Sequence, residues 1–307
     1  GNAIIYLNTV DKAIKVYKEV KDLVLKSGKN IPVILYHSRF TEKYKQRKEN
    51  MLLDNLGRKA WNNGIAKGIA ILTQIGEISI NISSELMISE VCPIDRLMQR
   101  AGRLCRFDNS VGEMYILIPY KDNTLYPAPY GSYSQSDKSW IPCKALLATM
   151  DILKRGIYSA QDLVNILNKV YAEETNFSIK AQTNVKALEQ MFINNWLINP
   201  VEKWNDDDTH SNTWKSRDIG PQGTAFVIKP KCMHFYNYSE YAEFVLSYSI
   251  SLPVYLLDKG RKEHRIDSNC KITIGSNEPI FINVIREGFY TFDVGIDLTN
   301  NEEDNFL

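Results

Sequence analysis

A run of eight residues, QRAGRLCR, contains the side chains of this chain that are best suited to bind an anion. Arg100, Arg103 and Arg106 follow one another at intervals of three, after a segment that predicts a helix starting near Ile94. Residues three apart lie on neighbouring faces of a helix, so we expect the three guanidinium groups to converge on one phosphate. Gly102 removes a side chain where a backbone or a nucleotide has to come close. The competing interpretation is a solvated basic helix end that complements the helix dipole.

Apolar and amphipathic segments alternate around this run. Short apolar stretches predict buried strands at residues 3–7, 32–36, 68–73, 86–89 and 113–119. Amphipathic segments between them predict helices, the first capped by Thr9 or Asp11 and ended by Gly28, the second over Thr41–Leu56. This order predicts a parallel sheet flanked by helices over residues 1–120, an α/β domain long enough to bury its own core.

Four further segments carry polar residues at the ends of the predicted strands. They are Asn8-Thr9-Val10, His37-Ser38-Arg39-Phe40 with Gln46-Arg47, Thr73-Gln74 with Glu77, and Ser89-Glu90 followed by Pro93-Ile94-Asp95. Together with QRAGRLCR they resemble the second RecA-like lobe of a superfamily 2 helicase, and within that group the CRISPR-associated helicase of type I systems, a helicase-nuclease family. The resemblance covers residues 3–119 and implies a RecA-like fold there.

The resemblance implies roles around a nucleotide. Arg103 and Arg106 correspond to the family's catalytic arginine fingers, which stabilise charge on the γ-phosphate of an ATP held by the first lobe. The equivalent of Arg100 can instead tie the segment to its own domain through a salt bridge. The residues implied on the nucleotide side of this lobe are Gln99, Arg100, Gly102 and Asn81.

A second set of residues is implied to contact nucleic acid. His37, Ser38 and Arg39 follow a predicted strand, at the edge of the sheet where α/β domains bind ligands, and can contact a phosphate. Thr73 and Gln74 end the next strand on the same side. The alternatives are a packed histidine at the strand end, and a threonine favoured by strand propensity alone.

Two positions depart from the family pattern after the Thr73-Gln74 segment. Ser79 stands where the family has glycine, and Asn81 where it has the aspartate associated with the nucleotide sugar and with coupling between the lobes. An amide keeps a carbonyl acceptor but adds a donor, so we expect weakened nucleotide coupling at this loop.

The sequence contains no GxxxxGK[ST] phosphate-binding loop. We therefore expect ATP with Mg²⁺ to be bound mainly by a first RecA-like lobe, supplied by the same longer polypeptide or by a separate subunit. Single-stranded DNA and an RNA-guided CRISPR surveillance complex are the other implied partners. An HD nuclease is a further implied partner, because the four histidines His37, His210, His234 and His264 include no HD pair.

Composition sets the broad class. The chain has 307 residues, 44% of them hydrophobic and 24% charged, with no apolar run long enough to span a membrane and no signal peptide. Five widely spaced cysteines predict a reducing cytoplasm rather than a disulfide framework. We expect no metal site, since Cys232 and His234 lack a second pair of ligands. The net charge of +1 places any DNA contact on local patches.

The remaining two thirds of the chain give weaker patterns. Residues 121–200 are expected to form a surface linker over 120–139 followed by helices at 143–155, 160–174 and 184–194. Residues 201–307 are expected to form a small α+β C-terminal domain, with strands near 224–228, 271–274 and 280–285. Its polar opening contains Trp204 and Trp214, which fit a loop pinned to its own domain better than base stacking, and Asp206-Asp207-Asp208, which fit a solvated turn.

The sequence therefore predicts the C-terminal half of an ATP-dependent single-stranded DNA translocase or helicase in CRISPR interference, an ATPase only together with a first lobe. Two alternatives stay open. One is another superfamily 2 helicase without a CRISPR link. The other is a non-hydrolysing adaptor that keeps the lobe to bind DNA or protein, which Ser79 and Asn81 favour.

Overall fold

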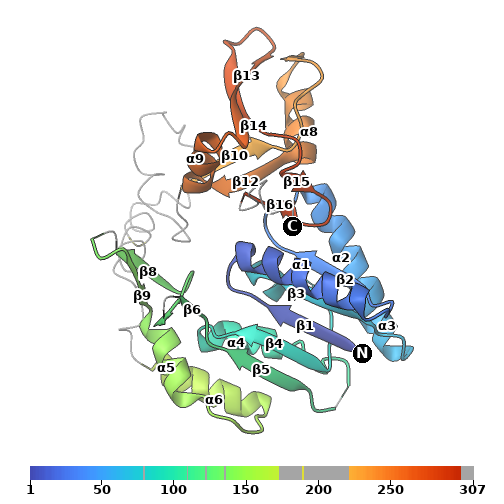
Figure 1. The fold of residues 1–307 in the computed structure, drawn as a ribbon, viewed down its shortest axis with the longest axis vertical. Coiled ribbons are helices and arrows are strands. Elements are labelled where there is room, and N and C mark those ends of the chain that lie inside the picture. The colour runs from blue at the N-terminus through green and yellow to red at the C-terminus, as the bar shows by residue number, and fades with distance from the viewer. Residues whose placement is uncertain are drawn as a thin grey trace.

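The structure is a computed structural model. It describes residues 1–78, 80–108, 110–121, 123–134, 136–172, 189 and 221–298. Figure 1 shows a lower unit built from the first third of the chain and an upper unit built from residues after 220. Helices and short hairpins follow the lower unit at its left side.

The lower unit is built on a five-stranded parallel sheet, whose spatial order is β2-β3-β1-β4-β5. The strands are β1 (Asn2–Tyr6), β2 (Val33–Tyr36), β3 (Gly68–Leu72), β4 (Leu86–Glu90) and β5 (Glu113–Leu117). Tyr6 lies opposite Leu72 on one side and Ser89 on the other. Because all strands run the same way, the loops after β1, β2, β3 and β4 meet at one edge of the sheet.

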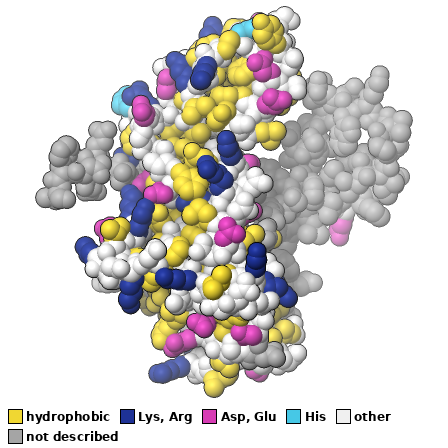
Figure 2. All heavy atoms as spheres, turned by 90° about the vertical axis from the view of Figure 1, so that its right-hand side faces the viewer, with side chains coloured by type: hydrophobic (Ala, Val, Ile, Leu, Met, Phe, Trp, Pro, Cys, Tyr) yellow, Lys and Arg dark blue, Asp and Glu magenta, His cyan; other side chains and the backbone are white. Residues whose placement is uncertain are grey.

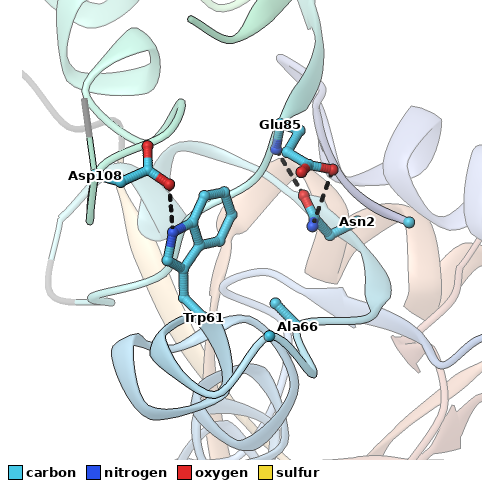
Figure 3. Close-up of a pocket in the computed structure, with 7 residues that line it drawn as sticks. Asn2, Trp61, Ala66, Glu85 and Asp108 are labelled. Atoms are coloured by element: carbon cyan, nitrogen blue, oxygen red, sulfur yellow. Dashed lines mark hydrogen bonds between the residues drawn. The ribbon is translucent and has the colours of Figure 1, made fainter. Parts of the chain in front are cut away.

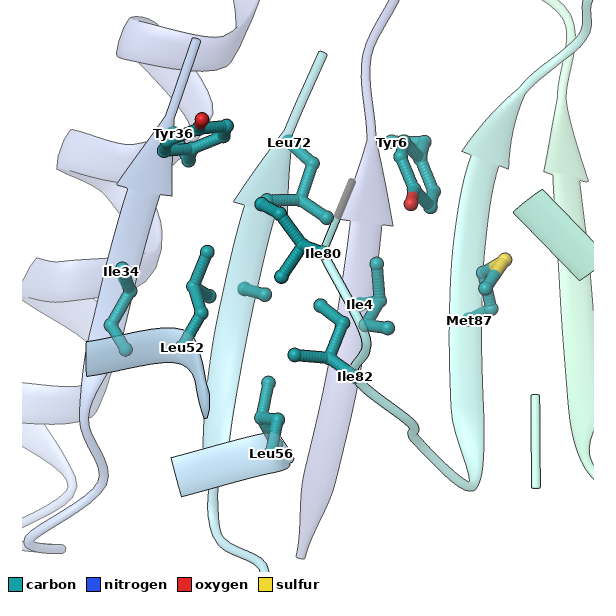
Figure 4. Packing of buried hydrophobic residues seen from close by; sticks show 11 residues of the cluster. Ile4, Tyr6, Ile34, Tyr36, Leu52, Leu56, Leu72, Ile80, Ile82 and Met87 are labelled. Atoms are coloured by element: carbon teal, nitrogen blue, oxygen red, sulfur yellow. The ribbon is translucent and has the colours of Figure 1, made fainter. Parts of the chain in front are cut away.

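Side chains of β1 alternate between the two faces of this sheet. Ile4 and Tyr6 join the core beneath α2 (Glu42–Leu56), whose Leu52 and Leu56 reach the strands (Figure 4). Ile5 and Leu7 join the opposite core, beneath α1 (Val10–Lys26). Both faces are therefore covered by helices, as a parallel sheet requires.

Three shorter elements complete this unit. They are α3 (Arg58–Asn62), the 3₁₀ helix η1 (Gln74–Glu77) and α4 (Ile94–Ala101). The segment after η1 crosses the sheet, and its Ile80 and Ile82 are buried against β3 and β1 (Figure 4). The sequence predicted α4 at its observed start and missed α3, which has only five residues.

The segment predicted as a surface linker has structure of its own. It forms two hairpins, β6 (Tyr120–Lys121) with β7 (Thr124–Leu125), and β8 (Gly131–Ser134) with β9 (Ser139–Pro142). The helices α5 (Lys144–Ile152) and α6 (Ala160–Val170) follow and pack on α4. Of the helix predicted at 184–194 the structure describes only Glu189, which is helical. The polar loop with Trp204, Trp214, Asp206-Asp207-Asp208 and His210 lies outside the described residues.

The upper unit, here called the C-terminal module, contains a second sheet in the order β11-β13-β14-β10-β12. Its strands are β10 (Gln222–Phe226), β11 (His234–Phe235), β12 (Ser249–Pro253), β13 (Ile266–Ile274) and β14 (Ile280–Ile285). The helix α8 (Tyr238–Tyr248) packs on one core of this sheet and α9 (Val254–Lys262) on the other. A small hairpin of β15 (Tyr290–Thr291) and β16 (Gly295–Ile296) ends the described chain.

The predicted fold class is confirmed: a parallel sheet flanked by helices is followed by a helical segment and a small α+β unit. No helix in the described parts of the chain is long and apolar enough to cross a membrane. On the face shown in Figure 2, positive and negative side chains are interspersed around an irregular band of hydrophobic ones.

Candidate nucleotide and nucleic-acid site

Arg100 is the centre of a buried polar network at the carboxyl edge of the first sheet. Its side chain has no exposed surface and its Nε donates to Glu77 Oε1 over 2.8 Å. Its NH1 donates to Ser89 Oγ at 2.9 Å and to the Glu90 carbonyl at 3.0 Å, and its NH2 to Asn8 Oδ1 at 3.1 Å. The guanidinium thus joins the loops after β1 and β3 to the end of β4, and its charge is compensated within the lobe.

The loop after β1 is fixed by the same network. The Asn8 backbone N–H donates to Glu90 Oε2 over 2.7 Å, and Lys12 Nζ donates to Glu90 Oε1 over 2.6 Å. Gln74 Nε2 donates to the Asn8 carbonyl over 2.7 Å. Four separate segments of the sequence are therefore brought together at one edge.

Arg103 approaches Glu77 from the turn that follows α4. Its NH2 donates to the Glu77 carbonyl over 2.7 Å, and only 5% of its surface is exposed. Its buried Nε has no hydrogen-bond partner among the described residues. Burial lowers the pKa of Arg103 and raises that of Glu77, an increase that Arg100 opposes.

Arg106 and Gln99 are exposed at the same end of α4. Arg106 NH1 donates to the Gly102 carbonyl over 3.3 Å, and its backbone N–H donates to Ser83 Oγ over 2.9 Å. Within the described residues neither Arg103 nor Arg106 takes part in an ion pair. The prediction that all three guanidinium groups converge on one phosphate is therefore wrong for Arg100, because the helix ends at Ala101 and Arg100 points into the lobe.

Gly102 and Asn81 are the two remaining residues predicted on the nucleotide side. A Cβ at Gly102 would meet the Met98 carbonyl at 3.4 Å and the Gln99 carbonyl at 3.6 Å, which are ordinary contacts. Nothing in the described chain thus requires glycine there, and a close approach by a nucleotide stays a prediction. Asn81 is exposed between buried Ile80 and Ile82, and Ser79 lies outside the described residues.

The loop between β2 and α2 contains the predicted phosphate contacts His37, Ser38 and Arg39. His37 is fully buried, its ring stacks on Phe40, and its Nε2 donates to the Val294 carbonyl over 3.0 Å. Burial, assisted by nearby Arg39, lowers the pKa of His37 to about 3. Arg39 is 7% exposed and forms an ion pair with Asp11. Ser38, between His37 and Arg39, is exposed.

The end of β3 carries the other predicted nucleic-acid residues. Thr73 is 2% exposed, and its backbone N–H donates to the Tyr36 carbonyl over 3.4 Å. Gln74 is half-buried, and its side-chain amide donates a hydrogen bond to the Asn8 carbonyl. Both residues therefore lie at the same edge as the arginine network, with Thr73 covered in this structure.

A pocket of about 320 Å³ lies at the opposite, amino edge of the sheet (Figure 3). Trp61 Nε1 donates to Asp108 Oδ2 over 2.8 Å across it, and the Glu85 backbone N–H donates to Asn2 Oδ1 over 2.6 Å. These polar groups are hydrogen-bonded to one another. Because parallel α/β sheets bind ligands at their carboxyl edge, this pocket is not the candidate site.

Comparison with known families identifies the lobe. Residues 1–109 match the family described as CRISPR-associated nuclease/helicase Cas3, C-terminal. This part of the chain is therefore similar to the C-terminal region of Cas3 helicases. The match contains every one of the motif segments that meet at the carboxyl edge.

Individual relatives agree with this assignment. The chain is 34% identical over 195 residues to the CRISPR-associated nuclease/helicase Cas3 of Streptococcus thermophilus, which covers 60% of this chain and 19% of that protein. It is 34% identical over 99 residues to the CRISPR-associated endonuclease/helicase Cas3 of Escherichia coli K12, covering 32% of this chain and 11% of that protein. The chain thus spans a fifth or less of the length of these curated relatives.

Solved Cas3 structures share the fold beyond the family match. The structure titled T. fusca Cas3-AMPPNP superposes with a TM-score of 0.60, covering 93% of this chain and 35% of that one at 16% identity. T. fusca Cas3 gives 0.57 over 82% of this chain and 32% of that one at 17% identity. The similarity of fold therefore extends beyond residues 1–109.

Sequence reasoning missed one member of the Arg100 network, Tyr130. Its hydroxyl accepts a hydrogen bond from Arg100 NH2 at 3.1 Å, and burial raises its pKa. Tyr130 lies between the two hairpins of the segment predicted as a linker. A tyrosine among glycines, serines and prolines carries no pattern that could have assigned it to the arginine network.

Proposed function

We propose that this chain supplies the second motor lobe and the C-terminal module of an ATP-dependent single-stranded DNA translocase of the Cas3 family. The observation that carries the proposal is the common edge: motif segments far apart in sequence meet around Glu77 and Arg100, and the family match covers the same residues. Such an edge is where α/β domains place their ligands.

The donor set fits a nucleotide phosphate. Arg103 has a buried Nε without a partner in the described chain, and neighbouring Arg106 and Gln99 are exposed. Guanidinium and amide donors of this kind suit an anion, and ATP with Mg²⁺ would supply the phosphoryl group and the cation that partly neutralises it. Arg100 instead holds Glu77 and orients the turn that bears Arg103. We assign it to positioning, and Arg103 and Arg106 to charge stabilisation.

The proposal requires a first RecA-like lobe to bind most of the nucleotide, because this sequence has no phosphate-binding loop. Ser38 is the residue we assign to the phosphate backbone of single-stranded DNA, with Arg39 held close behind it by Asp11. An RNA-guided CRISPR surveillance complex and an HD nuclease are the proposed partners, by analogy with the nuclease/helicase relatives.

The deciding experiment is DNA-stimulated ATP hydrolysis by this chain together with a first helicase lobe. Arg103→Ala is expected to lower turnover by roughly three orders of magnitude while leaving DNA affinity nearly unchanged, as for an arginine finger. Arg58→Ala, which removes an exposed arginine from α3, serves as the control and should retain turnover. If a folded, DNA-binding wild-type assembly hydrolyses no ATP, the chain is an adaptor and the motor proposal is wrong.

A further inference from the structure

The β15–β16 hairpin of the C-terminal module lies directly on the loop between β2 and α2. The Ile296 backbone N–H donates to the Arg39 carbonyl over 3.1 Å, and His37 Nε2 donates to the Val294 carbonyl over 3.0 Å. The Arg39 backbone N–H donates in turn to His37 Nδ1 over 3.1 Å, which fixes the proton on Nε2. The imidazole therefore bridges the hairpin and the loop.

The approach of the two backbones requires a glycine in the hairpin. Gly295 has a φ of +69°, and a Cβ there would lie 2.6 Å from the Arg39 carbonyl oxygen and 2.9 Å from His37 Cε1. Both the conformation and the space exclude a side chain. The contact is thus built into the hairpin and is closer than ordinary packing between two units.

Tyr290 fixes the other end of the loop. Its hydroxyl accepts a hydrogen bond from the Thr41 backbone N–H at 3.2 Å and lies 3.1 Å from Thr41 Oγ1. Its ring stacks on Tyr44, with centroids 5.6 Å apart. Thr41 is the N-cap of α2, whose first turn would otherwise leave this N–H without a partner. The hairpin therefore contacts the first residues of α2.

These contacts leave one side chain of the loop exposed. His37, Arg39, Phe40 and Thr41 are each 7% exposed or less, whereas Ser38 between them is exposed. Lys48 of α2 adds a further link to the hairpin, because its Nζ donates to the Asp293 carbonyl over 3.2 Å. Because its neighbours in the loop are buried, the exposed Ser38 is held in a fixed place.

We infer that the β15–β16 hairpin is a positioning element for nucleic-acid binding, which holds the β2–α2 loop so that the Ser38 hydroxyl meets a backbone phosphate of a single strand. The inference rests on the proposed function. A preorganised donor binds an anion without the entropic cost of ordering the loop, so loosening the hairpin should weaken binding through Ser38.

The test compares Tyr290→Phe, Gly295→Ala and Ser38→Ala in the assembled protein, with Tyr115→Phe as the control. Tyr115 is an exposed tyrosine whose hydroxyl bonds to Glu113 on its own strand. None of these substitutions changes the charge, so the general attraction to phosphate stays the same. Binding of a fluorescein-labelled oligothymidylate is followed by fluorescence anisotropy.

We expect Tyr290→Phe and Ser38→Ala each to weaken binding about two- to tenfold, the range for one hydrogen bond. Gly295→Ala would place a Cβ against the Arg39 carbonyl and His37. We expect it to weaken DNA binding at least as much. Tyr290→Phe should have no further effect in the Ser38→Ala background, because coupled residues are not additive. A purely structural loss would weaken both backgrounds equally, and that result would overturn the inference.

Two other outcomes separate this inference from the function on which it rests. Normal binding by Tyr290→Phe and Gly295→Ala, with weakened binding by Ser38→Ala, would overturn the hairpin's role and leave the proposed function intact. Failure of the wild-type assembly to bind the oligonucleotide would overturn both.

Discussion

Arg100 and Arg103 come from the same short run of sequence, yet they differ in what they contact. Arg100 is neutralised by Glu77 and also donates to the loop after β1 and to the end of β4. Arg103 donates to a carbonyl and keeps one buried nitrogen without a partner in the described chain. The spacing of the arginines established that cations gather here. It could not tell which of them faces a carboxylate, because Glu77 lies more than twenty residues earlier in the chain.

The burial of the Arg100–Glu77 pair leads to a prediction about stability. Arg100→Met should lower the free energy of unfolding by about 3–5 kcal/mol, because the buried carboxylate of Glu77 loses its partner. Adding Glu77→Leu should recover much of this loss, since neither charge of the pair then remains. Arg106→Met, at an exposed position of the same run, should change it by less than about 0.5 kcal/mol. Urea denaturation measures all three, and equal losses in Arg100→Met and Arg106→Met would contradict the prediction.

His37 leads to a prediction about pH. Burial lowers its pKa to about 3 in the folded chain, against about 6.5 when unfolded, so between these values only the unfolded chain binds the proton. The His37 contribution is complete above about pH 6.5 and is lost as the pH falls toward 3, by up to a few kcal/mol. His37→Gln keeps a donor for the Val294 carbonyl but does not titrate. Its unfolding free energy should therefore fall less steeply than that of the wild type from pH 7 to pH 4, and identical slopes would contradict this.

At the scale of elements, the sequence predicted the first sheet well because each strand is a short apolar run between amphipathic helices. Gly28, with a φ of +65°, follows α1 as a helix-ending glycine should. The segment after β5 was harder, because tyrosine, serine, glycine and proline fit a linker as well as the two hairpins that it forms. Composition alone does not distinguish a turn that links strands from a turn in an open loop.

For the candidate site too, the sequence predicts features that depend on neighbouring residues and misses contacts between residues far apart in the chain. The arginines, Ser38 and the polar strand ends could be named from the sequence, since their chemistry and order are local. The burial of His37 could not, because its covering residues Val294 and Gly295 are some 250 positions away. The local sequence around a histidine at a strand end is the same whether its side chain faces DNA or packs against a distant part of its own chain.

At the scale of the whole molecule, the β15–β16 hairpin belongs to both units. Val294 packs against the core beneath α1, whereas Ile296 and Leu298 are buried in the core of the C-terminal module. Lys18 and Lys21 of α1 form ion pairs with Asp297 and Asp293. Because adjacent residues of one short segment are anchored in different cores, the lobe and the module should move as one body.

Phe292 offers a way to test this coupling. Its ring lies 4.5 Å from Lys48 Nζ and meets Tyr44 edge-on with centroids 5.1 Å apart, both on α2. Phe292→Ala should cost about 1–3 kcal/mol, less than a fully buried phenylalanine would, and should speed hydrogen exchange at the amides of the first turns of α2. Phe281→Ala removes the same ring from a site of the module that is 67% exposed and should leave that exchange unchanged. If Phe292→Ala speeds exchange only within the C-terminal module, the hairpin does not hold α2, and the two units are joined by the chain alone.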